Sequence, residues 1–229
     1  MENLRVVIVE PEYEVNLGSV CRAMANFGYG SLYLVSPKCD PSGFEARMYS
    51  KHALPILEQA KIVKSLKQAT AGCSRIIGTT GVLRRHKKTI RDPIALRKLP
   101  KLALGGKVAV VFGREGIGLS QKEIDQCDML LHVETHEKYP VMNLSHAVAV
   151  VLYAFSSLGQ KPIEQASRSE LRQLERFFAA LVEGCGKKLR NPHKVKIAFR
   201  RIMQRSAPSK IEAVSVLGVM RLAADKIKK

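Results

Sequence analysis

The segment Glu10–Met24 (EPEYEVNLGSVCRAM) carries the first pair of side chains whose types and spacing could do chemistry. Asn16 can cap a helix with its side-chain oxygen, and Arg22 follows six residues later. We expect the helix to begin near Asn16 and both side chains to face one cleft at the end of the preceding strand, where open α/β sheets bind ligands. Each residue alone also has a purely structural use, as a helix cap or as a surface charge.

Two further turns carry polar side chains. Phe112–Ser120 (FGREGIGLS) places Glu115 between two glycines, where an acid adds nothing to a turn but can order a loop or accept a hydrogen bond from a ligand. Tyr139–Val148 (YPVMNLSHAV) enters a helix through Asn143. The glycines match neither the G-x-G-x-x-G dinucleotide fingerprint nor a G-x-x-x-x-G-K-[ST] phosphate loop. The three segments predict a ligand-binding site but do not identify the ligand.

These segments follow short apolar runs that predict buried β-strands. The runs are Leu4–Val9, Leu32–Val35, Arg75–Thr79, Lys107–Phe112 and Met129–Val133. Helical patterns lie at Leu17–Phe27, at Ile56–Ala71, from Ser120, where Glu123 completes a capping box, and at Asn143–Ser157. Strands that alternate with helices and are apolar on both faces predict an α/β fold, a mostly parallel sheet covered by helices on two sides.

Beyond residue 160 the pattern becomes entirely helical. Helices are predicted at Ser167–Glu183, Pro192–Arg205 and Ser209–Lys226. Asn191 before a proline, and Ser209 with Glu212, are typical of helix starts. We therefore predict two domains, an α/β domain over residues 1–160 and a small all-helical domain over residues 161–229.

The charge of the chain points to a polyanionic partner. Its 229 residues include 38 Lys and Arg against 20 Asp and Glu, a formal net charge of +18. The excess concentrates in Arg84–Lys101, with eight basic residues and one acidic, and in residues 162–229, with sixteen basic and six acidic. The longest apolar run, Ala147–Phe155, has nine residues. A membrane-spanning helix needs about 20, so integral membrane proteins are excluded.

Cysteine and histidine spacing favours neither a disulfide framework nor a metal site. The chain contains five scattered cysteines without a C-x-x-C pair: Cys21, Cys39, Cys73, Cys127 and Cys185. Such spacing is typical of free thiols in a reducing cytoplasm. His132 and His136 have metal-like spacing only on a helix, whereas the pattern puts them between a strand and a loop, so we expect no metal.

Taken together and in order, the three turns resemble the motifs of the SPOUT superfamily of RNA methyltransferases, in its TrmH-like ribose 2′-O branch. The matching residues are Asn16 with Arg22, Glu115 within Phe112–Gly116, and Asn143 with Ser145. The resemblance covers about Arg5–Phe155 and extends more loosely over the tail. It implies a SPOUT-type fold, in which the carboxy-terminal segment of the α/β domain threads through a loop as a trefoil knot.

The resemblance also implies that S-adenosylmethionine is bound in the knot as the methyl donor. The residues that it assigns to this cofactor are Thr79, Thr80, Gly81, Gly113, Glu115, Gly116, Val133, Met142, Asn143 and Leu144. One departure is Glu134, which stands where many relatives have a proline after the last strand.

By the same resemblance, the reaction is methylation of a ribose 2′-hydroxyl of tRNA, in the anticodon loop at nucleotide thirty-two, by a cytoplasmic homodimer. The catalytic residues would be Arg22, Asn16 and Ser145. A guanidinium is a poor base because its pKa lies above about 12, so we expect Arg22 to bind the phosphate beside the target ribose. The expected RNA-binding residues are Arg84, Arg85, Lys87, Lys88, Arg200 and Arg201, and the helical tail would bind RNA or brace the dimer.

Two alternatives stay open at this point. A ribosomal RNA ribose 2′-O-methyltransferase would use the same chemistry on another RNA. A non-catalytic RNA-binding protein could have kept the fold, although the intact residues Asn16, Arg22, Glu115 and Asn143 speak against it. Binding of S-adenosylmethionine would separate an enzyme from such a protein.

Overall fold

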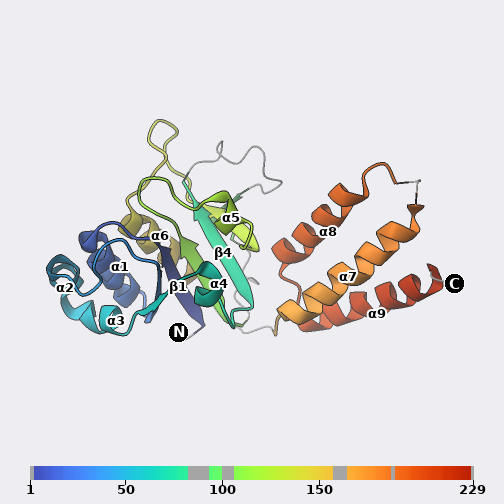
Figure 1. Cartoon of the computed structure of the whole chain (residues 1–229), viewed down its shortest axis with the longest axis horizontal. Helices are drawn as coiled ribbons and strands as arrows, with labels where there is room; N and C mark the ends of the chain where they lie inside the picture. Colours follow the sequence, from blue (N-terminus) through green and yellow to red (C-terminus); the bar gives the residue numbers. More distant parts are fainter. Residues whose placement is uncertain (1–2, 82–92, 100–105, 157–163, 187–188, 228–229) are drawn as a thin grey trace. The chain divides into compact units, whose positions relative to one another are not determined.

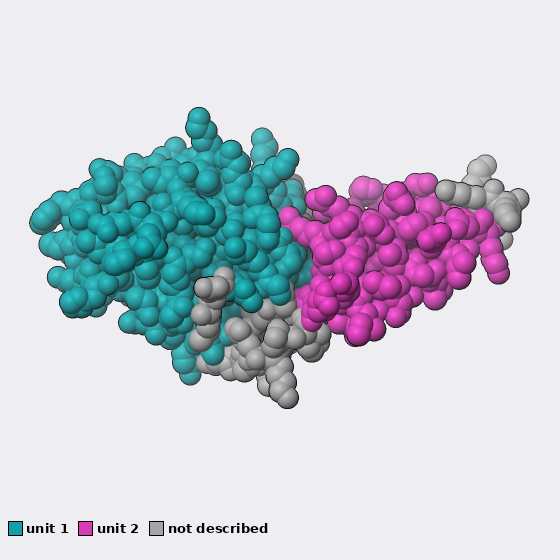
Figure 2. All heavy atoms as spheres, turned by 90° about the horizontal axis from the view of Figure 1, so that it is seen from below, with its two compact units in different colours: residues 1–160 teal, residues 161–229 magenta. Residues whose placement is uncertain are grey.

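The computed structural model describes residues 3–81, 93–99, 106–156, 164–186 and 189–227. Contacts divide the chain into two units, residues 1–160 and residues 161–229 (Figure 2). In the described residues, the first unit contains a parallel sheet between helices and the second unit contains three helices (Figure 1).

The described strands of the first unit form one parallel sheet. In spatial order they are β3 (Lys61–Val63), β2 (Ser31–Val35), β1 (Leu4–Val9), β6 (Val108–Phe112), β4 (Arg75–Thr80), β7 (Met129–His132) and β5 (Ile94–Ala95). In central β1, Val6 pairs with Leu32 of β2 on one side and with Val110 of β6 on the other. Because all pairs are parallel, the carboxyl ends of β1, β6, β4 and β7 lie side by side at one edge of the sheet.

Helices cover both faces of this sheet. One face packs against α1 (Glu14–Asn26), α2 (Phe44–Ser50), α3 (Leu54–Glu58) and α6 (Leu144–Ser156), and the other against α4 (Leu66–Ala69) and α5 (Gln121–Ile124). In β1, Val6 and Ile8 join the first core, whereas Val7 and Val9 join the second. Burial on both faces explains why the strand is an unbroken apolar run.

The five predicted strands are confirmed to within one residue at either end. The capping box of Ser120 and Glu123 is present at the start of α5. The first helix begins earlier than predicted, at Glu14, and its cap residue Tyr13 makes no side-chain capping bond. Asn16 therefore lies inside the first turn of α1 and does not cap the helix.

The helix predicted over Ile56–Ala71 is wrong, because that range contains the end of α3, strand β3 and helix α4. Ser65 accepts a hydrogen bond from the Gln68 amide (3.3 Å), which starts a new helix after the strand. Strand β3 has only three residues and lies at the edge of the sheet, where Ile62 is 60% exposed. So short and exposed a strand has no apolar periodicity to mark it. Helix α2 and strand β5 were not predicted either.

The helices of the second unit are α7 (Arg168–Gly184), α8 (Pro192–Ser206) and α9 (Lys210–Ile227). Their starts match the sequence signals. The Asn191 side chain accepts a hydrogen bond from the Lys194 amide (3.1 Å), and Ser209 and Glu212 bond reciprocally as a capping box. The core is small, and the stacked rings of Phe178 and Phe199, with centroids 3.8 Å apart, join α7 to α8.

Within the described ranges, no helix is both long and apolar enough to cross a membrane. The same ranges hold no group of three or more His, Cys, Asp or Glu side chains arranged for a metal ion. His132 is buried at the end of β7, and its Nδ1 lies 3.1 Å from the Thr80 carbonyl oxygen of β4. None of the five cysteines, all of which lie within the described ranges, forms a disulfide.

The two-faced core leads to a prediction with a matched control. Ile8→Ala should lower the free energy of unfolding by about 2–5 kcal/mol, because it leaves a cavity at a fully buried position of β1. The same substitution at exposed Ile62 of β3 should cost less than about 1 kcal/mol. Urea denaturation of both variants measures the difference; equal losses would contradict the arrangement of the core.

Candidate functional site

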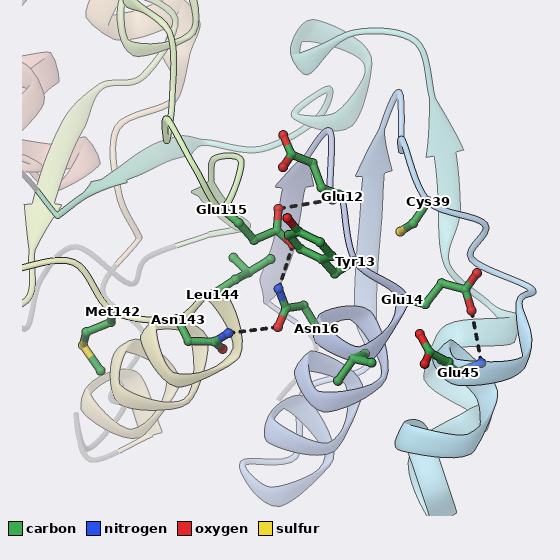
Figure 3. Close-up of a pocket in the computed structure, with 11 residues that line it drawn as sticks. Glu12, Tyr13, Glu14, Asn16, Cys39, Glu45, Glu115, Met142, Asn143 and Leu144 are labelled. Atoms are coloured by element: carbon green, nitrogen blue, oxygen red, sulfur yellow. Dashed lines mark hydrogen bonds between the residues drawn. The ribbon is translucent and has the colours of Figure 1, made fainter.

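The three turn segments meet at the carboxyl edge of the sheet. The first follows β1 and forms the start of α1, the second follows β6, and the third joins β7 to α6. Since β1 and β6 are neighbours, residues about 100 positions apart in the sequence lie close together (Figure 3).

A series of side-chain hydrogen bonds connects the three segments (Figure 3). Ser145 Oγ donates to Asn143 Oδ1 (2.8 Å), and Asn143 Nδ2 donates to Asn16 Oδ1 (3.0 Å). Asn16 Nδ2 in turn donates to Glu115 Oε1 (2.9 Å). We call these three bonds the polar chain; the backbone amide of Glu12 donates to the other Glu115 oxygen (3.2 Å).

The polar chain fixes the side chain of Asn16 from both ends. A carboxylate accepts hydrogen bonds only, so the amide nitrogen of Asn16 must face Glu115 and its oxygen must face Asn143. Asn16 is only 8% exposed, which makes each of these bonds costly to lose. The residue predicted as a helix cap is therefore the link between the first and the other two segments.

A cavity of about 630 Å³ opens beside the polar chain (Figure 3). It is lined by Glu12, Tyr13, Glu14, Val15, Asn16, Cys39, Glu45, Glu115, Met142, Asn143 and Leu144. Four of these side chains are carboxylates and none is basic. Glu14 is engaged at the start of α2, where it accepts hydrogen bonds from the Glu45 and Ala46 amides (3.1 and 3.4 Å).

A narrower pocket of about 130 Å³ lies on the other side of Glu115. Its lining includes nine of the ten residues expected to hold the cofactor: Thr79, Thr80, Gly81, Gly113, Glu115, Gly116, Val133, Met142 and Leu144. The tenth, Asn143, lines the larger cavity. Glu115, Met142 and Leu144 line both, so they form a shared wall between the two spaces.

The narrow pocket combines apolar walls with exposed backbone. Val133, Val141 and Val151 contribute apolar side chains, and the glycines of the Gly113–Gly118 loop leave backbone groups accessible. A methyl group added at Gly116 would meet no atom within 4 Å, so open space lies above that residue. Such a pocket can hold a flat, mostly apolar group whose polar edge bonds to the backbone.

Arg114 anchors the Gly113–Gly118 loop, a role that the sequence did not reveal. Its guanidinium binds Glu10, with Nη2–Oε1 at 2.8 Å and Nε–Oε2 at 3.1 Å, and also binds both oxygens of Glu123 at 3.0 Å. The hydrogen bond from Arg114 lowers the pKa of Glu10. Burial raises the pKa of Glu123, but the bonds from Arg114 and Ser120 outweigh it and leave the pKa lowered.

The structure does not bring Arg22 to this site. Arg22 is exposed on α1 and lines neither cavity. Six residues along an α-helix leave two side chains about 120° apart around the axis, so Asn16 and Arg22 lie on different faces of α1. The expectation that both face one cleft is wrong within a single copy of the chain.

The remaining expected residues lie elsewhere. Arg84, Arg85, Lys87 and Lys88 fall outside the described residues. In α8, Arg200 is exposed with its Nε 3.6 Å from Glu175, and Arg201 is half-buried. Glu134, at the position where a proline was expected, forms an ion pair with Arg97 (2.8 Å).

The chain is similar in sequence and structure to known methyltransferases. The sequence profile of the SpoU rRNA Methylase family matches residues 3–153. A relative from Methanocaldococcus jannaschii, named tRNA (cytidine-2′-O-)-methyltransferase TrmJ, is 34% identical over 95% of this chain and 98% of its own length. A relative from Pseudomonas aeruginosa, named tRNA (cytidine/uridine/adenosine-2′-O-)-methyltransferase TrmJ, is 32% identical over 96% of this chain and 93% of its own.

Among solved structures, a probable methylase family protein from Haemophilus influenzae superimposes with a TM-score of 0.69 at 29% identity. The match covers 98% of this chain and 97% of that protein.

The glycine loop generates a prediction with a matched pair of variants. In Gly113→Ala, the added methyl would collide with the backbone of Gly118 and Leu119, which cannot move aside as a side chain can. We expect a loss of about 1–3 kcal/mol or more in unfolding free energy. Gly116→Ala points into open space and should change stability by less than about 0.5 kcal/mol. Thermal unfolding compares them; a harmless Gly113→Ala would contradict the loop geometry.

Proposed function

The chain belongs to the SpoU rRNA Methylase family, and on this premise we propose that it transfers a methyl group to a ribose 2′-hydroxyl of tRNA. The family match covers residues 3–153, but the M. jannaschii and P. aeruginosa relatives align over both units, and both are named tRNA 2′-O-methyltransferases. Their names favour tRNA over ribosomal RNA as the substrate.

The observation that carries this proposal is the position of the polar chain. It ends on Glu115, which belongs to the wall shared by the two cavities. Two reactants bound on either side of that wall would meet beside the Asn16 and Glu115 side chains. A non-catalytic RNA-binding protein would have no need for a series of side-chain hydrogen bonds that holds a buried asparagine at that place.

We assign S-adenosylmethionine, which supplies an electrophilic methyl group when bound, to the narrow pocket because of its apolar walls and its glycine loop. Val133, Val141 and Leu144 would pack against the adenine ring, and the backbone of the Gly113–Gly118 loop would bond to polar groups of the cofactor. The open space above Gly116 leaves room for such a ligand. Thr79 is half-buried, and its hydroxyl already donates to the Val111 carbonyl (3.0 Å), so it supports the wall of the pocket.

The larger cavity would receive the target nucleotide. Asn16 and Asn143 line this cavity with amide groups that can orient a ribose hydroxyl. Ser145 lines neither cavity and would act by holding the Asn143 side chain. Fixing the hydroxyl in line with the methyl donor is the main source of acceleration, worth about 7–11 kcal/mol in well-oriented reactions. These residues would supply orientation, and none of them has to act as a strong base.

The acidic lining of this cavity supports a role for a second copy of the chain. A target nucleotide brings phosphates, yet the cavity presents the carboxylates of Glu12, Glu14, Glu45 and Glu115 and no basic side chain. Arg22 is exposed on α1 and is not among the residues that line its own cavity. We infer that the protein acts as a homodimer, in which Arg22 of one copy binds the phosphate beside the ribose held by the other copy.

The helical unit would bind the rest of the tRNA. Residues 162–229 carry sixteen basic and six acidic residues, and Arg200 is exposed on α8. The basic run from Arg84 to Lys101 would provide a second contact with the RNA backbone. Affinity that comes from such contacts falls steeply with salt concentration.

Finer features of the family are part of the same proposal. We expect cytidine or uridine at nucleotide thirty-two of the anticodon loop as the target, in the cytoplasm, where tRNA is available. We also expect the trefoil knot. A methyl group added at Gly81 would lie 3.6 Å from Val141, which places the segment after β7 beside the end of β4, its neighbour in the sheet.

The proposed reaction is tested by incubating the protein with total tRNA, ribosomal RNA and labelled S-adenosylmethionine, and by mapping the labelled nucleotide. We expect labelled ribose in tRNA alone. Asn16→Ala should lower the rate at least about 10²-fold, because it breaks the polar chain at its centre. Asn26→Ala, at the exposed end of the same helix, is the matched control and should keep the wild-type rate. Label in ribosomal RNA alone would favour the alternative substrate.

The role of Arg22 across the dimer is tested by mixing two inactive variants. Arg22→Ala and Asn16→Ala should each be inactive. In a mixed dimer one site combines an intact Asn16 with an intact Arg22 from the other copy, so random exchange of subunits should restore about one quarter of the activity. If Arg22 acted within its own copy, no activity would return. A wild-type protein that is monomeric by light scattering would also contradict the proposal.

A further inference from the structure

We propose that Arg114 is a positioning residue for the methyl-donor pocket. It would hold the Gly113–Gly118 loop in the one shape that presents Glu115 and Gly116 to the cofactor. This inference deepens the proposed function and rests on it. Four observations support it: the loop closes on itself, two carboxylates hold the Arg114 side chain, the loop carries residues of the pocket, and the two carboxylates need a cation between them.

The loop is closed on itself at Arg114 and Gly118. The Gly118 amide donates to the Arg114 carbonyl (2.9 Å), and Arg114 Nη1 donates to the Gly118 carbonyl (3.3 Å). Gly118 has a φ of +68°, a conformation that favours glycine. Gly113 lies so close to the Gly118 backbone that a side chain would not fit. Arg114 thus contributes both its backbone and its side chain to the closure.

The guanidinium also anchors the closed loop to two elements that lie far apart in sequence. Glu10 comes directly after β1, and Glu123 belongs to the first turn of α5, where it also completes the capping box with Ser120. Both carboxylates bind with two oxygens at 2.8–3.1 Å. This paired geometry fixes the direction of the guanidinium plane as well as its position, which a single contact would not do.

The anchored loop carries the groups that the pocket needs. Glu115 follows Arg114 directly and ends the polar chain, while Gly116 and Ile117 line the pocket. A shift of about 1 Å in a supporting residue can cost about 10²-fold in rate. Arg114 fixes the backbone next to Glu115, and the polar chain fixes the Glu115 side chain. Together they determine where the Glu115 carboxylate lies.

The charges explain why no neutral residue would serve in place of Arg114. Its side chain is 13% exposed and that of Glu123 is 15% exposed. Without the guanidinium, the Glu10 and Glu123 carboxylates would lie near each other, screened by solvent mainly at Glu10, whose side chain is 27% exposed. Lys38 lies 3.5 Å from Glu10, but it is 61% exposed and belongs to another loop. A lysine at position 114 would restore the charge without the fork of donors that binds both carboxylates.

The test is calorimetric titration of the full-length protein with S-adenosylmethionine at a temperature where every variant is folded. We expect Arg114→Gln to weaken binding at least about tenfold and Arg114→Lys to recover part of that loss. Arg47→Gln is the matched control. It removes the ion pair with Glu58 (3.2 Å) on the same unit, and Arg47 lines neither cavity, so binding should be unchanged.

Glu10→Gln provides a second variant with a milder change, because Arg114 keeps Glu123. We expect it to weaken binding several-fold. A Kd within twofold of wild type for both Arg114→Gln and Glu10→Gln would overturn the inference, even if their thermal stability falls, because Arg114 would then stabilise the fold without positioning the pocket.

Hydrogen exchange separates this inference from the proposed function. Arg114→Gln should speed exchange at the amides of the loop, from Gly116 to Gly118, with no ligand present. Unchanged exchange would overturn the positioning role. A wild-type protein that binds no S-adenosylmethionine while Arg114→Gln loosens the loop would contradict the proposed function and leave the role of Arg114 in shaping the loop intact.

Discussion

The side chain of Asn16 is the link on which the site depends. It is nearly buried, it donates to Glu115 and it accepts from Asn143, so one amide joins segments 99 and 127 residues away along the chain. The Glu115 segment lies beside Asn16 because β1 and β6 are neighbours in a parallel sheet whose carboxyl ends share an edge. Asn143 lies beside Asn16 because α6 packs against α1. The sheet and the packing of α6 against α1 bring the segments close together, and the loop held by Arg114 positions the Glu115 carboxylate. The Asn16 amide then sets the direction of each hydrogen bond. Loss of any one of these would leave a buried polar group without a partner, and the cost of that makes the arrangement specific.

Much of the architecture can be predicted from the sequence, because buried strands and capped helix starts have recognisable residue patterns. Strand β1 is apolar at every position since both of its faces are covered, and Ser120 with Glu123 marks the start of α5 by its capping chemistry. Strand β3 leaves no such signature, since it is short and exposed at the edge of the sheet. Glu115 could be singled out from the sequence because an acid between two glycines has no role in a turn. Arg114 could not, because nothing in its spacing relates it to Glu10 and Glu123, which come together only in the folded chain. Asn16 stands out in the sequence as a helix cap, but in the structure it makes tertiary hydrogen bonds in place of the capping bond.

The chain has a net charge of +18, but the cavity beside the polar chain is surrounded by negatively charged side chains. The cavity beside the polar chain is lined by four carboxylates and no basic side chain, while the tail and the run from Arg84 to Lys101 hold most of the excess positive charge. Attraction of a polyanion and handling of its reacting sugar therefore fall to different parts of the molecule. Long-range attraction depends on net charge, whereas orientation of a hydroxyl depends on short hydrogen bonds. This division gives a physical reason for a second copy of the chain to supply Arg22, the cation that the cavity lacks.

We propose that the methyl donor binds on one side of Glu115 and the target ribose on the other. A crystal structure of the protein with S-adenosylhomocysteine, the product left after methyl transfer, tests this most directly. We expect the ligand in the narrow pocket against the Gly113–Gly118 loop, with its sulfur directed toward the wall formed by Glu115, Met142 and Leu144. Ligand bound in the larger acidic cavity, or outside both spaces, would contradict it.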